Sequence, residues 1–209
     1  MSKPTARWEI NAEALAKKAI NDRQQLNELL QGILSREDKT RYTSFKALMF
    51  IADEQPELLY PHWDYFATLI SGENTHSKYI GIYLLAALTV VDKDNKFEQM
   101  FDKYYGLLND KSIIPSAHVA GNSGRIVKAK AQLEPKITDR LLSIDKTHHN
   151  PGHRELIKSH AIEAFNEYFE HAEDKKKILE FVKRQLKSKS PKTKNRAKEF
   201  LKKWGSAGT

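Results

Sequence analysis

The stretch DKTRYTSFKAL, residues Asp38–Leu48, contains the pattern that decides the fold. Its basic residue Arg41 is followed three positions later by the small Ser44, and six and seven positions later by Ala47 and Leu48. The spacing returns at Lys78/Gly81/Leu84/Leu85, Lys158/Ala161/Ala164/Phe165 and Lys194/Ala197/Phe200/Leu201, and in part at Pro115/His118/Gly121/Asn122. A pattern that recurs after roughly 40 residues indicates stacked repeats, because equivalent helices reuse small residues where they touch.

An apolar pair precedes each of these segments and is expected to close an earlier helix: Ile33-Leu34, Leu69-Ile70, Leu107-Leu108, Leu141-Leu142 and the weaker Gln185-Leu186. The residues in between are cap and turn formers, such as Asn109-Asp110 and Ser190-Pro191. Apolar residues from Phe97 to Leu108 recur at steps of three and four, and no segment alternates as a half-buried strand does. The sequence therefore predicts an all-α chain of five helical hairpins.

The residues carry a resemblance to a known family. The pair Leu107-Leu108 with Asn109-Asp110 after it, and the pattern from Asp38 to Leu48, resemble the HEAT-like (armadillo-type) helical repeat family over roughly residues 26–204. The resemblance implies a right-handed α-α superhelix, or solenoid, of about five hairpins with an N-terminal capping helix. The family includes scaffolds, transport factors and a minority of DNA-repair enzymes, so the resemblance says little about activity.

We expect one repeat domain over residues 1–209. Residues 1–20 form the N-terminal cap, with a first helix over Trp8–Ile20, and the hairpins cover 21–54, 55–92, 93–131, 132–172 and 173–205. Stacking is expected to be irregular in the third hairpin, which contains Pro115, Gly121 and Gly124, and at the insertion Asp145–His153 in the fourth. The physical reason for the array is that a single hairpin cannot bury its apolar face alone.

Composition excludes several classes of protein. Of the 209 residues, 40% are hydrophobic and 30% are charged, which is an ordinary balance for a folded water-soluble chain. Because there is no cysteine, disulfides, thiolate metal sites and cysteine nucleophiles are excluded. The segment from Met1 to Ile20 has no apolar signal-peptide core, and the longest apolar stretch, Ile80–Val91, is too short to span a bilayer. We expect a cytoplasmic monomer with no membrane contact.

Positive charge is concentrated at the C-terminal end. Between Lys175 and Lys203 there are 13 basic and two acidic residues, whereas the rest of the chain has 22 basic and 25 acidic residues. This excess could contact phosphates through Lys183, Arg184, Lys187, Lys189, Lys192, Lys194, Arg196 and Lys198, with further contacts from Arg125, Lys128 and Lys130. The alternative is a solvated surface that keeps the end of the array soluble.

Three polar residues of the third hairpin could line a groove. His118, Asn122 and Arg125 fall at i, i+4 and i+7, and they would form a polar stripe on one side of a helix. Polar residues on the inner helices of a solenoid line its concave face, so we expect this stripe to face a ligand. The adjacent glycines are interpreted as sites of close helix packing or a kink, since no strand precedes them as in a phosphate-binding loop.

The histidines give no clear metal site. His148, His149 and His153 lie in the inserted loop, where Pro151 and Gly152 argue against a helix and no carboxylate has ligand spacing beyond Asp145. We interpret that segment as an exposed loop without metal. His160 lies on an apolar helix face and is expected to be a hydrogen-bonded core residue.

Aromatic residues and a carboxylate occur together at His62-Trp63-Asp64-Tyr65-Phe66, as a base-excision pocket would require. The other interpretation is an outer helix whose Trp63 and Phe66 pack in the core. No catalytic motif of the HEAT-like DNA glycosylases is present, so we predict no catalytic residue and no cofactor.

Two functional classes follow from these features. The first is a non-enzymatic scaffold that binds a protein partner in its concave groove. The alternative is a nucleic-acid-binding module that uses the basic C-terminal hairpin, with a DNA glycosylase as a remote third hypothesis. Binding to a protein would tolerate salt, whereas binding to nucleic acid would weaken steeply as salt rises.

Overall fold

The computed structural model describes residues 7–205, with side chains from residue 11 onward. In that part of the chain all regular structure is helical and no strand occurs, which confirms the predicted all-α class. The first six residues of the predicted N-terminal cap and the last four residues of the predicted domain lie outside the described residues. Contacts group the chain into an N-terminal unit that ends at Asn95 and a C-terminal unit that begins at Lys96.

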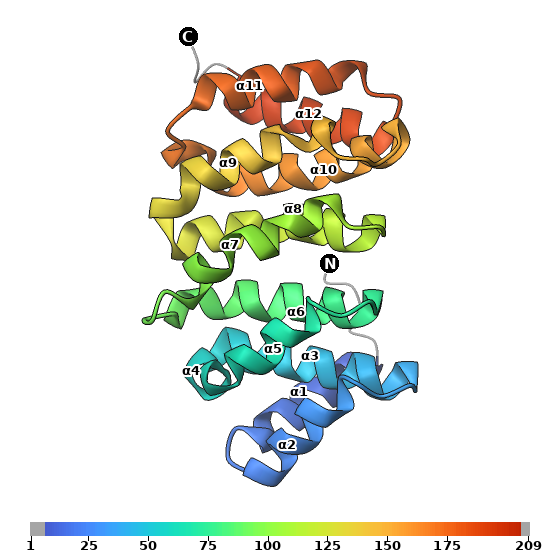
Figure 1. The fold of residues 1–209 in the computed structure, drawn as a ribbon, viewed down its shortest axis with the longest axis vertical. Coiled ribbons are helices and arrows are strands. Elements are labelled where there is room, and N and C mark those ends of the chain that lie inside the picture. The colour runs from blue at the N-terminus through green and yellow to red at the C-terminus, as the bar shows by residue number, and fades with distance from the viewer. Residues whose placement is uncertain (1–6, 206–209) are drawn as a thin grey trace. The chain divides into compact units, whose positions relative to one another are not determined.

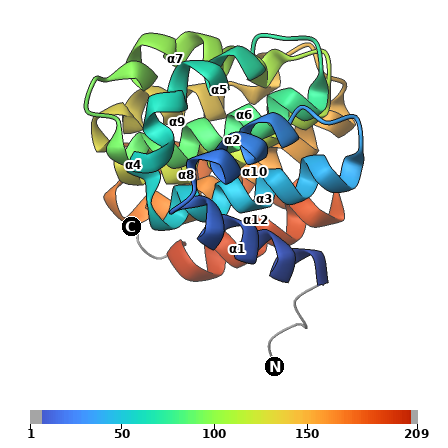
Figure 2. The ribbon, with the colours of Figure 1, turned by 90° about the horizontal axis from the view of Figure 1, so that it is seen from below.

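The N-terminal unit contains a row of three packed helices (Figures 1 and 2). Helix α1 packs on α3 and α3 packs on α6, while α2 packs on α1 and α3, and α5 packs on α6. The helices are α1 (Arg7–Ala19), α2 (Arg23–Gly32), α3 (Asp38–Glu54), α4 (Pro56–Leu59), α5 (Trp63–Leu69) and α6 (Thr75–Leu88). Large apolar side chains fill the space between them, among them Leu48, Ile51, Trp63 and Phe66, each at most 2% exposed.

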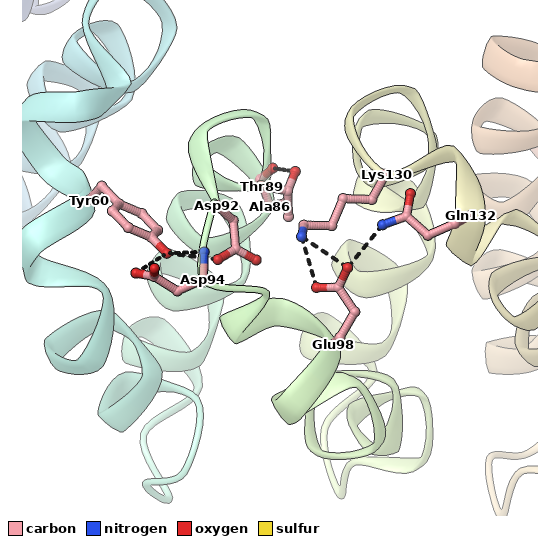
Figure 3. A network of polar contacts seen from close by, with 8 residues as sticks. All are labelled: Tyr60, Ala86, Thr89, Asp92, Asp94, Glu98, Lys130 and Gln132. Carbon is pink, nitrogen blue, oxygen red and sulfur yellow. Dashed lines mark hydrogen bonds and ion pairs between the residues drawn. The ribbon is translucent and has the colours of Figure 1, made fainter.

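Side-chain hydrogen bonds fix a helix start and a bend in this unit. The carboxylate of Asp22 accepts the N–H groups of Gln24 and Gln25 at the start of α2, at 2.9 and 3.1 Å. A one-turn 3-10 helix, Tyr60–His62, separates α4 from α5. The hydroxyl of Tyr60 lies 2.8 Å from a carboxylate oxygen of Asp92, and this contact ties the bend to the loop after α6 (Figure 3). Side-chain capping of this kind satisfies backbone groups that a helix end leaves unpaired.

The C-terminal unit repeats the arrangement with six helices among its described residues. Helix α8 packs along α10 and α10 packs along α12, while α9 contacts α8, α10 and α11 (Figure 1). The helices are α7 (Lys96–Gly106), α8 (Ile113–Ala129), α9 (Glu134–Leu142), α10 (Pro151–Tyr168), α11 (Lys175–Arg184) and α12 (Pro191–Trp204). Ser112, Asn150, Asp174 and Ser190 cap α8, α10, α11 and α12 through their side chains.

The structure places helices inside the ranges predicted for the hairpins, whereas their pairing as repeats stays a prediction. The pairs α2–α3, α5–α6, α7–α8, α9–α10 and α11–α12 each fall within one predicted hairpin range, and α1 occupies the predicted first helix. The apolar pairs lie where the first helices end, since α5 ends at Leu69 and α9 ends at Leu142. That the hairpins form one domain over the whole chain stays a prediction. In the described part of the chain no helix combines the length and hydropathy needed to cross a bilayer.

One local expectation is wrong and another stays a prediction. Helix α8 runs without interruption, with Pro115 in its first turn, where its missing N–H breaks no helical hydrogen bond. Irregular stacking of the third hairpin stays a prediction. The argument that Pro151 and Gly152 oppose a helix is wrong, because Pro151 occupies the first position of α10 and His153 lies in its first turn. Proline is favoured there, since its fixed φ suits a helix start.

Candidate functional site

Helices α11 and α12 with the turn between them, residues 175–204, form what we call the basic hairpin. Most of its apolar positions are buried, including Phe181, Ala197 and Phe200, and this burial leaves the other faces of both helices to solvent. Seven of the eight predicted polyanion contacts are exposed: Lys183, Arg184, Lys187, Lys189, Lys192, Lys194 and Lys198. Arg196 is half-buried.

Acidic partners are scarce around these cations. Among the described residues, Arg196 is the one member of the eight with a carboxylate in ion-pair contact, that of Glu163 on α10. Lys192 points its ammonium at the ring of His160, with Nζ 3.4 Å from Nε2, and Arg184 lies over the ring of Phe181. The remaining exposed amines are therefore available to an external anion.

The basic residue of the sequence pattern has a different role in α3 and α10 than in α12. Arg41 is held by Asp38 and donates to the carbonyl of Ser35 at 2.9 Å. Lys158 is 8% exposed, with Nζ 2.5 Å from the carboxylate of Asp145. The equivalent Lys194 on α12 is exposed. The basic residue of the pattern thus anchors a turn in these two hairpins and faces solvent in the last.

A carboxylate on α10 fixes the start of α12. Glu155 accepts the backbone N–H groups of Lys189 and Ser190 at 3.3 and 2.8 Å, and its carbonyl accepts the hydroxyl of Thr193 at 2.7 Å. Partial burial acts to raise the pKa of Glu155, but these backbone donors, the hydroxyl of Ser188 and the charge of Lys158 together lower it. The turn that carries Lys187 and Lys189 is therefore ordered by α10.

The predicted groove stripe on α8 lies at its contact with α10. His118 is half-buried, with its ring centroid 6.2 Å from that of His160, and Asn122 is 8% exposed. The amide nitrogen of Asn122 donates to the carbonyl of His118 at 2.9 Å, within its own helix. Arg125 is half-buried. The three residues share a face as predicted, but Asn122 is committed to its own helix and His118 to the contact with α10.

His160 is not a core residue as expected, because 23% of its side chain is exposed at the junction of α8, α10 and α12. Its Nδ1 lies 3.2 Å from Glu163, and its Nε2 faces the ammonium of Lys192. These partners fit a neutral ring that donates from Nδ1 and accepts at Nε2. Burial, together with the charges of Lys192 and Arg196, lowers the pKa of His160 to about 4.

Small residues bring the helices of this contact together. A Cβ on Gly124 would lie 2.7 Å from the carboxyl carbon of Glu167, so α8 can approach α10 this closely only with glycine or with movement of that side chain. The carboxylate of Glu167 pairs with Lys128 at 2.8 Å. This confirms the interpretation of close helix packing for Gly124, whereas a Cβ on Gly121 would meet its nearest neighbour only at an ordinary contact distance of 3.5 Å. Lys128 is consequently neutralised by its neighbour.

Lys130 is not placed to meet phosphate. Its side chain is buried, and its ammonium binds both carboxylate oxygens of Glu98 at 3.0 and 2.8 Å (Figure 3). The amide of Gln132 donates to the same carboxylate at 2.9 Å. The hypothesis that Lys130 contributes a phosphate contact is therefore replaced by a structural role. Sequence alone could not show this, because Glu98 comes from the preceding helix.

The inserted loop is ordered through its histidines. His149 is 4% exposed, with Nε2 2.9 Å from the hydroxyl of Ser116, and the ring of His148 stacks on it at 4.6 Å. Burial, followed by the charges of His148 and His153, lowers the pKa of His149. The expectation of an exposed loop is therefore wrong for His149. No group of three metal-binding side chains occurs in the described part of the chain.

An aromatic pocket in the N-terminal unit was not predicted. It has a volume of about 260 Å³ and lies between α3 and α6, with Tyr42 at 40% exposure and Phe45 and Tyr79 stacked edge-to-face at 5.2 Å. Tyr83 contacts Tyr79, with ring centroids 4.9 Å apart. A signal existed in the sequence, because Tyr42 and Tyr79 each follow the basic residue of the repeated pattern.

The segment from His62 to Phe66 does not form a pocket for a base. Trp63 and Phe66 are at most 2% exposed, whereas the carboxylate of Asp64 is on the exposed side of α5. This is the outer-helix arrangement that the sequence left as the alternative. An acid and aromatic rings therefore do not converge here.

The described surface thus offers two chemistries: exposed amines on the basic hairpin, which suit a polyanion, and tyrosine rings on α3 and α6, which suit a partner side chain. Comparison with protein-family models, curated proteins and solved structures gives no significant match. Function must be inferred from these residues.

Proposed function

We propose that this protein is a non-enzymatic nucleic-acid-binding module whose phosphate-binding surface is the basic hairpin. The observation that carries the proposal is the set of exposed amines on α11, α12 and their turn, most of which have no carboxylate neighbour. Cations that contact phosphates release condensed counterions, and this release supplies most of the non-specific affinity for nucleic acid. A surface that served solubility alone would intersperse charges of both signs.

A nucleic acid fits this surface better than an anionic membrane does. Membrane-surface helices combine basic residues with a continuous apolar face that enters the lipid. The apolar faces of α11 and α12 are instead buried in the C-terminal unit, and Leu186 is the one large apolar residue of the hairpin at or above 36% exposure. Binding to the phosphates of a nucleic acid requires only cations at intervals along the protein surface.

The finer architecture that we propose is a HEAT-like solenoid of five hairpins, in which the basic hairpin is the last repeat. Support comes from the five helix pairs, from their shared spacing pattern, and from the order α8, α10, α12 in which second helices pack in the C-terminal unit. In such an array the terminal repeat has one face without a neighbour. Additional lysines on that face do not disturb the packing between neighbouring helices. We propose that the protein acts as a cytoplasmic monomer.

The test compares two triple variants of equal charge. Lys183→Gln, Arg184→Gln and Lys187→Gln remove three exposed cations from the basic hairpin, whereas Lys18→Gln, Lys39→Gln and Lys93→Gln remove three from the N-terminal unit. Each phosphate contact contributes about 0.9 to the salt slope on duplex DNA, so the first variant should lower the slope by about 2.7. Affinity near 0.1 M salt should fall on the order of a hundredfold.

Fluorescence anisotropy with labelled DNA at several salt concentrations measures both quantities, and circular dichroism checks that both variants are folded. The control variant should retain the affinity of the wild-type protein to within a few fold. Equal losses in both variants would contradict the proposal, because they would show a dependence on net charge alone. Binding to anionic vesicles without binding to DNA would contradict it as well.

A second candidate function is a protein-binding scaffold, and the aromatic pocket between α3 and α6 favours it. Tyrosine is enriched at the centres of protein interfaces, where a ring gives a large contact area for little loss of entropy. Tyr42 and Tyr79 present such rings beside the shallow cavity of about 260 Å³. A partner bound there would be recognised by binding that tolerates salt and is unaffected by the three substitutions in the basic hairpin.

A further inference from the structure

We infer that the basic hairpin selects double-stranded over single-stranded nucleic acid, because it offers charge without a surface on which bases can stack. The inference rests on the proposed function and adds the class of nucleic acid. Proteins that prefer single strands combine a basic groove with exposed aromatic rings, and each stacked base contributes about 1 to 3 kcal/mol.

The aromatic residues of the hairpin are not available. Phe181 is fully buried and Phe200 is 2% exposed, each within the packing of the C-terminal unit. Trp204 at the end of α12 is half-buried. Its ring packs on Phe169 at 5.3 Å, its Nε1 donates to Asn166 at 2.9 Å, and the ammonium of Lys203 lies 4.4 Å from its centroid. A base would have to displace that lysine to reach the ring.

The same holds for the rest of the described C-terminal unit. Phe97, Phe101, Tyr104, Tyr105, Phe165, Tyr168 and Phe169 are each less than 9% exposed. The large exposed apolar side chains of this unit are the aliphatic Ile114, Leu156 and Leu186. Among phenylalanine, tyrosine and tryptophan, Trp204 is therefore the one residue in the described part of this unit that is not buried, and the ammonium of Lys203 lies over its ring. The contacts that we infer for this surface therefore go to phosphate and not to stacked bases.

The cations themselves are arranged for a rigid backbone. Arg196, and Lys192 beside it, occupy the side of α12 that meets α10, through Ser159, Glu163 and His160. Lys194 and Lys198 fall one turn apart on roughly the opposite side of the helix, following its period of about 3.6 residues. The hydrogen bonds of Glu155 hold the turn that precedes them. These amines extend from helices whose backbones are held by packing, which favours a partner whose phosphates are likewise held at regular spacing, as in a duplex.

A purely electrostatic contact favours the duplex because its charge density is higher. Each contact contributes about 0.9 to the salt slope on duplex DNA and about 0.7 on a single strand. If Lys183, Arg184, Lys187, Lys189, Lys194 and Lys198 all bind phosphate, the slopes are about −5.4 and about −4.2. The difference corresponds to roughly tenfold tighter binding of the duplex near 0.1 M salt.

The experiment measures the full chain against a short duplex of mixed sequence and against oligothymidylate of equal length, each over a series of salt concentrations. Roughly tenfold preference for the duplex, with the steeper slope, supports the inference. Trp204→Leu and Tyr42→Ala should leave both affinities unchanged. Should Trp204→Leu fail to fold, the ratio of the two wild-type affinities and their two salt slopes still test the duplex preference.

Two outcomes are distinguishable as failures. Equal or tighter binding of the oligothymidylate, weakened by Trp204→Leu or Tyr42→Ala, would overturn the duplex preference while leaving nucleic-acid binding intact. If neither probe binds in a way that depends on salt and on Lys183, Arg184 and Lys187, the proposed function itself fails.

Discussion

The row of packed helices in each unit solves the same packing problem with different chemistry. In the N-terminal unit α3 and α6 meet through rings, with Phe45 5.2 Å from Tyr79 and 5.8 Å from Tyr83. In the C-terminal unit α8, α10 and α12 add to their buried apolar residues a close approach at Gly124, a histidine pair and ion pairs. An aromatic contact depends on buried area, whereas a polar contact depends on the charge of its members.

The difference bears on what each row can do at its surface. Ion pairs and neutral histidines between α8, α10 and α12 hold the basic hairpin in place and leave its outer amines free. Rings between α3 and α6 leave tyrosine edges beside a cavity. The C-terminal unit therefore exposes amines that take no part in helix packing, and the N-terminal unit exposes tyrosine rings.

The largest effect should come from removing the centre of the aromatic contact. Phe45 is 2% exposed and touches both Tyr79 and Tyr83, so Phe45→Ala deletes a buried ring and leaves a cavity. Changes of this type cost about 3 to 5 kcal/mol. Urea unfolding at neutral pH and near pH 5 should show the same loss at both, because no side chain in this contact titrates between them.

Tyr42→Ala is the matched control, since this ring is 40% exposed at the edge of the same cluster. Its loss should cost about 1 kcal/mol or less, as for an aromatic contact at the surface. Similar losses for Phe45→Ala and Tyr42→Ala would mean that the rings do not hold α3 against α6.

The helices could be predicted from sequence because their signals are local. Apolar spacing, capping residues such as Asn74 and Ser190, and the repeated basic residue all act within one helix or its flanking turn. The exposure of the basic hairpin also followed from its own amphipathic pattern. For α11, the buried Ile178 and Val182 stand four residues apart and leave the lysines outside.

The remaining site features could not be predicted because their partners are distant in sequence. Lys130 resembles its basic neighbours until Glu98 is seen beside it, 32 residues earlier in the chain. His149 is buried beside its hydrogen-bond partner Ser116, which lies 33 residues earlier in the sequence. The position of His160 likewise depends on Lys192. Which helices become neighbours decides whether a charge is free, and that is a property of packing.

Acid should lower the stability of the helix row that contains His160 more than that of the aromatic row in the N-terminal unit. His160 is neutral in the folded protein because its pKa is lowered to about 4, whereas in the unfolded chain it takes up a proton near pH 6.5. A depressed pKa contributes stability that is present above the unfolded value and is lost as pH falls toward the folded value. The loss between pH 7 and 4 should be about 1 to 3 kcal/mol, allowing for solvent at a partly exposed ring.

Every charged group facing His160 enters this balance: Lys192 and Arg196 from α12, His118 from α8 and Glu163 on its own helix. His160→Gln removes the titrating ring, so its unfolding free energy should fall less steeply with acid than that of the wild-type protein. His76→Gln, an exposed change in the N-terminal unit, is the control and should leave the slope unaltered. An unchanged slope in His160→Gln would show that the ring takes up a proton at the same pH in the folded and the unfolded chain, and that its pKa is not lowered.

The smallest changes in unfolding free energy are expected for two Gly→Ala substitutions, and they should have opposite signs in the two units. They test whether glycine is required for helix packing. A Cβ on Gly81 of α6 would lie 2.8 Å from Ile70 and 3.0 Å from the backbone oxygen of Phe66. Gly81→Ala should therefore cost about 1 to 2 kcal/mol despite its better helix propensity.

On Gly121 of α8 a Cβ would meet His160 Nδ1 at 3.5 Å, which is an ordinary van der Waals distance. Gly121→Ala should accordingly stabilise the C-terminal unit by up to about 1 kcal/mol, because alanine loses less backbone entropy than glycine when a helix forms. Thermal and urea unfolding of the two single variants would show the opposite signs. Destabilisation by Gly121→Ala would mean that α8 and α10 lie closer than these contacts indicate, and that the polar row, like the aromatic one, depends on an exact steric fit.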